Sequence, residues 1–278
     1  MKRHVVICLG AAIFLAGILA PLAPALASNE LPFKQTNIHF ETNASACDMG
    51  IQMSFDTEGI TVGEVENPYG DVVFSIGAVL GQEGTDDITE IFQERVEPPI
   101  WELLEALDCE PPEDDAIYLS ELLAAWPAGW YKFRGESGGE EFEGKARLTY
   151  RIPAGPEVTA PEDGDVVPHD QHLHITWEKV DGPIAEGIGL GPVEVVGYHV
   201  VVDDVTDSEP FAPGVTKTVL DVDLAAGETS LLVPKQFLEP GRIYEFEVLA
   251  TEKRGNETIT EGGVFCTPPI SPESCEAP

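Results

Sequence analysis

Basic residues are scarce in this sequence. The 278 residues include 15 Lys and Arg against 50 Asp and Glu, which gives a formal net charge of −35. Nucleic acids and anionic membranes bind proteins largely through Lys and Arg contacts to phosphate. The shortage argues against both as partners, and the simplest interpretation of the acidity is a charged, solubilising surface. Calcium binding is the alternative, because calcium prefers carboxylate oxygens.

Long apolar runs are also rare, and the clearest one lies at the N-terminus. Lys2 and Arg3 precede an apolar stretch from Val5 to about Ala20, and two prolines and a small-residue exit ending at Ala27 follow. The run is shorter than the roughly 20 residues that span a bilayer. It predicts a signal peptide over residues 1–27, cleavage after Ala27, and a mature chain without a membrane span, exported to a periplasm or the extracellular space. Removing Lys2 and Arg3 from the 15 basic residues leaves 13.

Cysteine is infrequent, and four cysteines remain after the predicted cleavage: Cys47, Cys109, Cys266 and Cys275. An even number in an oxidising compartment predicts disulfides, although four cysteines allow three pairings. Locality favours Cys47 with Cys109 and Cys266 with Cys275. A metal site is the alternative, but the sequence has no CxxC motif and no histidine close to these cysteines.

The first half of the mature chain has the pattern of a β-rich module. Residues 51–55 alternate apolar and polar side chains, and turn clusters join strand-like runs over 60–76 and 130–152. Helical spacing predicts one or two helical turns over 86–96, and leucines favour a short helix over 117–125. We therefore expect a sandwich-like module over residues 37–153, preceded by a tail over 28–36.

A proline-rich break over residues 153–156 ends this pattern, because proline cannot donate to a sheet ladder. Beyond it the alternation is stronger. Leu173, Ile175 and Trp177 share one face of a predicted strand, and further alternating runs cover 196–202 and 244–248. We expect a second module over residues 156–267 and a proline-rich tail over 268–278.

These residues resemble a fibronectin type III domain. The resemblance rests on Trp177 in an early strand, a Tyr-x-Val-x-Val strand at Tyr198, and Leu-x-Pro-Gly from Leu238 leading to Tyr244. It implies two antiparallel sheets, with Trp177 buried between them and Tyr244 acting as the tyrosine corner. The expected fold class is all-β, with two tandem immunoglobulin-like sandwiches and one or two short helices in the first.

The whole mature sequence also resembles a group of uncharacterised bacterial secreted proteins with a C-terminal fibronectin-type module. The similar stretches cover residues 48–52, 89–98 and 262–265. This second resemblance implies an architecture and no particular chemistry.

Motifs that resemble catalytic sites have simpler explanations. Residues 135–139 match G-x-S-x-G around Ser137, but a strand follows this turn where the hydrolase motif requires a helix. Residues 139–145 approach a phosphate-binding loop, yet Ala146 replaces the magnesium-binding hydroxyl and three glutamates would repel phosphate. We therefore expect a protein that is not an enzyme.

Three further features are candidates for binding. Asp203, Asp204 and Asp207 cluster at a strand end and are weak candidates for a calcium site, whereas solvated acidic loops are the commoner explanation. His172 and His174 share a strand face, but a third metal ligand is hard to supply there. Trp130 is expected to point outward from its strand, which makes it a candidate for exposed recognition.

The sequence thus predicts an exported, non-catalytic binding or structural protein whose modules contact a protein or glycan. The alternative is a calcium-dependent adhesion protein or carbohydrate-binding accessory protein. No cofactor is expected apart from calcium under that alternative.

Overall fold

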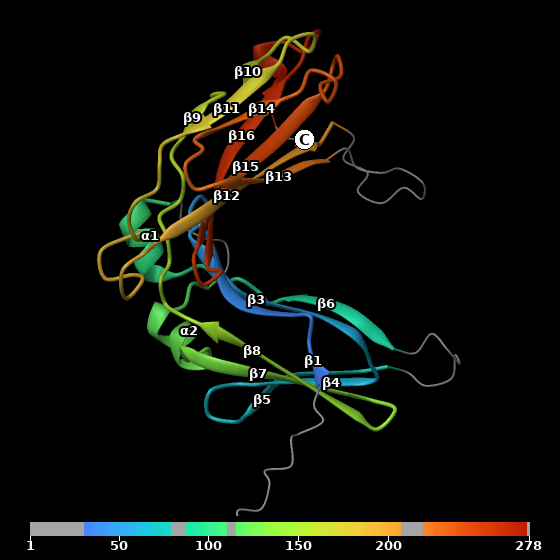
Figure 1. The fold of residues 1–278 in the computed structure, drawn as a ribbon. Coiled ribbons are helices and arrows are strands. Elements are labelled where there is room, and N and C mark those ends of the chain that lie inside the picture. Colours follow the sequence, from blue (N-terminus) through green and yellow to red (C-terminus); the bar gives the residue numbers. More distant parts are fainter. Residues whose placement is uncertain (1–30, 79–86, 110–114, 207–218, 277–278) are drawn as a thin grey trace, which may run out of the picture.

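The computed structural model describes residues 31–78, 87–109, 115–206 and 219–276. The predicted signal peptide and Asp207 lie outside these residues. Within the described residues, none of the helices has the length and apolar content that a bilayer crossing requires. The fold is almost entirely β, and Figure 1 shows a C-terminal part, coloured yellow to red, above an N-terminal part, coloured blue to green.

The strands of the described residues form three sheets. The largest contains, in spatial order, β13 (Val219–Ala225), β12 (Val195–Asp204), β15 (Ile243–Glu252), β16 (Glu257–Cys266), β2 (Gln35–Asn43), β3 (Asp48–Ile60) and β6 (Ile88–Glu94), with β10 (Asp165–Val166) also paired to β16. The second contains β1 (Leu31–Pro32), β8 (Glu140–Leu148), β7 (Gly129–Ser137), β4 (Val62–Glu66) and β5 (Val72–Gly77). The third contains β14 (Ser230–Val233), β11 (Leu173–Trp177) and β9 (Val158–Ala160). The helices are α1 (Trp101–Leu107), α2 (Leu119–Ala125) and the 3-10 turn η1 (Pro272–Ser274).

Each of the two smaller sheets covers one part of the large sheet and encloses its own hydrophobic core. The C-terminal core includes Trp177 of β11, Tyr198 of β12 and Phe246 of β15. The N-terminal core includes Phe40 of β2 and Tyr131 of β7. Alternation every second residue places these side chains on the covered face of each strand. The structure confirms the predicted all-β fold class with two sandwiches.

Tyr244 has the environment that the fibronectin resemblance implies. It is fully buried, and its hydroxyl donates to the Phe237 carbonyl at 3.3 Å while accepting the Glu239 N–H at 2.7 Å. Tyr131 repeats this arrangement in the N-terminal sandwich, where its hydroxyl donates to the Pro127 carbonyl at 3.1 Å. In both sandwiches a buried tyrosine fixes a strand to the chain just before it. The expected alternation over 196–202 breaks at Val196, which is 46% exposed because the register shifts between Val195 and Gly197.

The helix expected over residues 86–96 is wrong. Residues Ile88–Glu94 form strand β6, which pairs antiparallel with β3. The apolar residues that suggested a helical face point to both sides of the strand. Ile91 packs against the core, whereas Phe92 is 63% exposed. The free edge of β3 supplies backbone partners, and this pairing overrides the local pattern. The short helix expected over 117–125 is present as α2, whereas α1 was not predicted.

The two sandwiches are joined through the large sheet, which the sequence did not predict. Strand β16 pairs in parallel with β2, with Glu257, Thr258 and Ile259 opposite Glu41, Thr42 and Asn43, respectively. Two buried polar side chains reinforce this join. Asn256 accepts the Phe40 N–H at 3.0 Å and donates to the carbonyls of Thr149 and Arg151, both at 2.9 Å. Thr258 donates to the Pro153 carbonyl at 2.7 Å.

Two cysteine pairs are at disulfide-bonding distance, and they are the pairs that locality favoured. Cys47 and Cys109 connect the start of β3 to the end of α1. Cys266 and Cys275 connect the end of β16 to the C-terminal tail, and both are buried. The tail is thus attached to the C-terminal sandwich beside β10.

Candidate functional site

The two sides of β2 have opposite character. Ile38, Phe40 and Thr42 are buried against the N-terminal core, whereas His39 and Glu41 project from the side of the large sheet that neither smaller sheet covers. Strand alternation extends this polar side onto β3, β6 and β16. We define the seam face as the uncovered side of these strands and of the segment after β6, carrying His39, Glu41, Asp48, Glu94, Glu97, Glu257 and Glu261.

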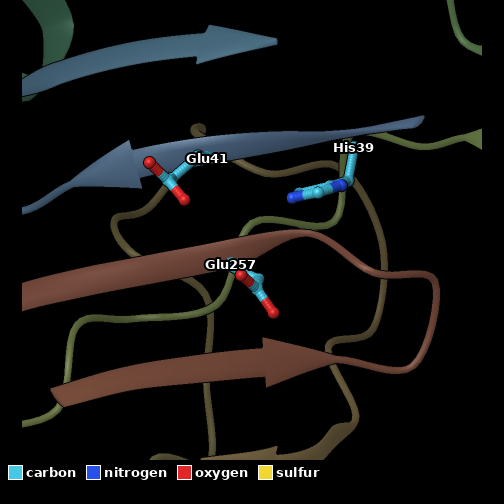
Figure 2. A group of neighbouring side chains, drawn as sticks. All are labelled: His39, Glu41 and Glu257. Atoms are coloured by element: carbon cyan, nitrogen blue, oxygen red, sulfur yellow. The ribbon is translucent and has the colours of Figure 1, made fainter. Parts of the chain in front are cut away.

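Two overlapping groups on the seam face bring possible metal ligands together. One ring nitrogen of His39 and one carboxylate oxygen from each of Glu41 and Glu257 all lie within 4.8 Å of one another. The same limit holds for oxygens of Glu41, Glu94 and Glu97. Figure 2 shows the His39 imidazole directed toward Glu41, with Glu257 on the neighbouring strand. Glu41 belongs to both groups and therefore links them.

His39 is one of the buried polar residues of the chain, since it is only 7% exposed. Its Nδ1 lies 3.1 Å from Nδ2 of Asn37, and its Nε2 is buried without a hydrogen bond of ordinary geometry. The Gln52 side chain, opposite His39 on β3, also interacts with the ring. Burial lowers the pKa of His39 to about 4. The ring is therefore neutral at physiological pH, which is the form that binds metal ions.

Several carboxyls on the seam face are held at pKa values far above their usual range. Burial, followed by repulsion from Glu257, raises the pKa of Glu41 to about 7. Burial, followed by repulsion from Glu41, raises the pKa of Glu97 to about 8. Burial and the charge of Glu261 raise the pKa of Asp48 to about 6. Burial also raises the pKa of Glu257. These half-buried groups repel one another, so the negatively charged form of the seam face is unfavourable.

Within the described residues, the ion pairs of Lys and Arg do not include these carboxyls, and the His199 imidazole lowers the pKa of Glu257 by less than burial raises it. The ion pairs there use other acids, such as Glu66 with Arg134 and Glu194 with Lys253. Oδ1 of Asp48 and Oε1 of Glu97 are buried without hydrogen-bond partners. A buried oxygen without a partner costs free energy that a cation or a proton can recover. The seam face therefore favours a positively charged ligand.

Gly50 makes room for one of these carboxyls. It lies on β3 opposite Glu41, and a Cβ built at this position would overlap the Glu97 side chain. The Glu97 side chain thus lies over the Gly50 backbone. A larger residue at position 50 would displace it.

Two of the three aspartates expected as weak calcium ligands, Asp203 and Asp204, lie within the described residues. Asp203 and Asp204 are consecutive on β12, so their side chains point to opposite sides of the sheet. Asp204 accepts hydrogen bonds from the N–H and hydroxyl of Thr206, at 3.1 and 2.6 Å, and lies 3.6 Å from Arg242. It therefore stabilises the end of β12. Asp207 lies outside the described residues.

Other candidate residues have local roles. Trp130 is 49% exposed, and the Lys145 ammonium lies 5.1 Å from its ring centroid. Ser137 lies in the β7–β8 hairpin, where its hydroxyl donates to Asp87 at 3.1 Å. His172 accepts the Lys235 N–H at 3.2 Å, and His174 is exposed on β11. His199 lies 2.6 Å from Asp221 on the neighbouring strand.

Sequence reasoning did not identify the seam face. Its residues come from positions 39–48, 94–97 and 257–261, and two pairings bring them together, the parallel join of β16 to β2 and the antiparallel pairing of β6 with β3. One signal was available, namely the strand alternation that places His39 and Glu41 on the side opposite Ile38 and Phe40.

Comparisons with known proteins do not place the chain in a family. No protein-family description and no curated protein matches it. Among solved structures, the fibronectin(III)-like modules of Clostridium thermocellum CbhA match with 11% identity over 86% of this chain and 95% of that one, at a TM-score of 0.29. A segment of two fibronectin type-III domains from chicken tenascin matches with 12% identity over 84% and 97%, at a TM-score of 0.26. Such low TM-scores mean that the backbones do not superpose closely, so the fold assignment stands on this chain's own strand pairing and cores.

Proposed function

We propose that this protein is an exported, non-catalytic binding or structural protein. Its two sandwiches act as one unit, and the seam face is its binding surface. One observation carries the proposal, namely that half-buried carboxyls outside the Lys and Arg ion pairs of the described residues are concentrated where the sandwiches join. Maintaining mutually repelling charges in one place costs stability, and a cationic ligand offsets that cost.

The features outside the seam face are consistent with this role. Two disulfides and the predicted signal peptide support export, because disulfides persist in oxidising compartments. Ser137, the serine of the G-x-S-x-G match, lies in a hairpin, and its hydroxyl donates a hydrogen bond to Asp87. This arrangement lacks the strand, turn and helix that present a hydrolase nucleophile to its base. The partner class is a protein with a basic surface, and a glycan is the alternative partner.

Charge-matched variants test the proposed binding surface. The mature chain is immobilised and exposed to the proteins secreted by its native source, at low and at high salt. We expect a basic protein to be captured by the wild type and released by salt, because exposed charge pairs are screened. Capture should be lost with E94Q/E261Q on the seam face and retained with E64Q/E141Q, whose exposed carboxyls lie on the other sandwich sheet.

Equal capture by both double variants would contradict the proposal, because the seam face would then not be the contact. Salt-resistant capture that both variants keep would favour a glycan or an apolar contact elsewhere.

A second candidate function is calcium-dependent adhesion or carbohydrate binding. The all-oxygen group of Glu41, Glu94 and Glu97 favours it, because calcium takes carboxylate oxygens in flexible geometry. Calcium should then raise the melting temperature of wild type and not of E94Q/E97Q. An unchanged melting temperature at millimolar calcium would reject this function and leave the first one standing.

A further inference from the structure

His39 distinguishes the first ligand group from an ordinary acidic cluster. The residue is only 7% exposed, and its ring is directed toward Glu41. Nε2 makes no hydrogen bond of ordinary geometry within the described residues, although the Gln52 side chain opposite it on β3 interacts with the ring. A buried ring nitrogen without a well-formed hydrogen bond requires an explanation, because nearly all buried polar atoms are paired.

We propose that His39, Glu41 and Glu257 bind one divalent transition-metal ion of the Zn²⁺ class, and that this ion connects the two sandwiches. The inference deepens the proposed function and rests on it, since it names a ligand of the same seam face.

The ligand set suits such an ion. Zinc binds imidazole nitrogen and carboxylate oxygen at about 2.0–2.2 Å, so donors around one ion lie roughly 3–4 Å apart. The three donor atoms here lie within 4.8 Å of one another, and small side-chain rotations bring them to that spacing. A water molecule would complete a four-coordinate site.

The surroundings of His39 resemble those of a metal-binding histidine. Such histidines usually hold the second ring nitrogen in a hydrogen bond, which fixes the tautomer and the orientation of the ring. Asn37 is the partner of the second ring nitrogen of His39, because its amide nitrogen lies 3.1 Å from Nδ1. A 180° turn of that amide presents Oδ1 to the Nδ1 proton, which leaves the Nε2 lone pair facing the carboxylates.

The imidazole also determines the class of metal. Calcium and magnesium prefer oxygen ligands alone, whereas zinc, copper and nickel accept imidazole readily. The group of Glu41, Glu94 and Glu97 is the place for calcium, and it shares Glu41 with the histidine group. The two groups should therefore differ in selectivity while influencing each other's affinity.

The position of this group gives the metal a structural consequence. His39 and Glu41 belong to β2, and Glu257 belongs to β16, so the ligands come from both sandwiches. The parallel pairing between these strands extends over only three residue pairs. An ion bound across it adds a cross-link where the sheet connection is shortest, and makes the relative position of the sandwiches more rigid.

Isothermal titration of the EDTA-stripped mature chain tests the inference, with Zn²⁺ as the probe and Mn²⁺ and Ca²⁺ in parallel. We expect one equivalent of Zn²⁺ to bind the wild type, and at least tenfold weaker binding to H39Q and E257Q. The matched controls are H174Q and E64Q, which change exposed residues on the two smaller sheets and should bind as the wild type does. Co²⁺ substitution provides a spectroscopic check, because the visible bands of bound Co²⁺ should change in H39Q.

Folding is measured separately so that a misfolded variant is not counted as support. Without metal, E257Q should melt no lower than the wild type, since the substitution removes a repelled charge beside Glu41. Zn²⁺ at 100 times its dissociation constant should raise the wild-type melting temperature by roughly 5–10 °C. E257Q that folds normally and no longer responds to Zn²⁺ would support the site.

Wild-type affinity retained by H39Q and E257Q, or no Zn²⁺ binding by the wild type at millimolar metal, would overturn the inference. In the second case the carboxyls share protons and no metal is held. Partner capture is repeated in EDTA to separate the two proposals. Capture that persists in EDTA, together with no Zn²⁺ binding, rejects only the metal site. Zn²⁺ binding without capture of any partner rejects only the binding role.

Discussion

The side chain of Asn256 accepts a hydrogen bond from the backbone N–H of Phe40, which lies 216 residues earlier in the chain, at 3.0 Å. Asn256 is 1% exposed, and its amide nitrogen donates to two carbonyls in the segment that links the sandwiches. A single side chain thus connects β2, the linking segment and the start of β16. This contact holds the two parts of the large sheet in register.

Replacing Asn256 should therefore destabilise the whole molecule. Asn256→Ala leaves a buried N–H and two buried carbonyls without partners, and we expect a loss of about 3 kcal/mol in the free energy of unfolding. Asn67→Ala, in the exposed turn before β5, is the control and should cost at most about 1 kcal/mol. Urea denaturation measures both. Equal costs would show that the join does not depend on Asn256.

The metal-free protein should lose stability between pH 6.5 and 8. The pKa of Glu41 is raised from 4.5 to about 7, and that of Glu97 from 4.5 to about 8, in both cases mainly by burial. Above pH 4.5 the folded state therefore binds more protons than the unfolded state, and its stability falls as the pH rises. His39 acts in the opposite direction, because burial lowers its pKa from 6.5 to about 4, so stability is gained as pH rises over that interval.

Below pH 6.5 the titration of His39 opposes that of the carboxyls. The effect of the carboxyls on stability is therefore best measured above pH 6.5. Urea denaturation in EDTA at several values from pH 6.5 to 8 measures the slope for the wild type and for E41Q/E97Q. The double variant should show a flatter profile, because the amides do not titrate. Parallel profiles would mean that these carboxyls have ordinary pKa values.

Gly50→Ala should release Glu97 from its half-buried position. The added methyl group overlaps the Glu97 side chain, which can rotate toward solvent. Its pKa should then fall toward the ordinary range, and the stability loss between pH 6.5 and 8 should become smaller than in the wild type. Gly182→Ala is the control, since a Cβ there meets nothing within 4 Å. A pH profile equal to that of the control would show that Glu97 does not need this space.

The two disulfides should differ in their contribution to stability. The stabilisation by a disulfide increases with the logarithm of the number of residues in the loop that it closes. The sequence separations are 62 for Cys47–Cys109 and 9 for Cys266–Cys275. We expect C47S/C109S to cost about 4 kcal/mol and C266S/C275S about 2–3 kcal/mol. Denaturation under non-reducing conditions measures both. A larger cost for C266S/C275S would show that packing of the tail outweighs loop closure.

Much of the fold could be predicted from local patterns, whereas the candidate site could not. Tyr244, Phe246 and Val248 alternate with glutamates, and strands formed where this period was clear. The pattern failed at β6, because Ile88, Ile91 and Phe92 fit a helical face as well as an edge strand. Only the presence of the β3 edge decides between these two structures.

The sequence by itself determined the acidic composition, the β-type alternation and the locality that pairs the cysteines, because each of these properties belongs to a residue and its near neighbours. Tertiary structure alone decided that β16 would pair with β2 and bring Glu257 beside His39 and Glu41. Hydrogen bonds between strands join generic backbone groups, so nothing in either segment specifies the other as its partner. The pKa shifts have the same origin, since burial and repulsion exist only after the strands are paired.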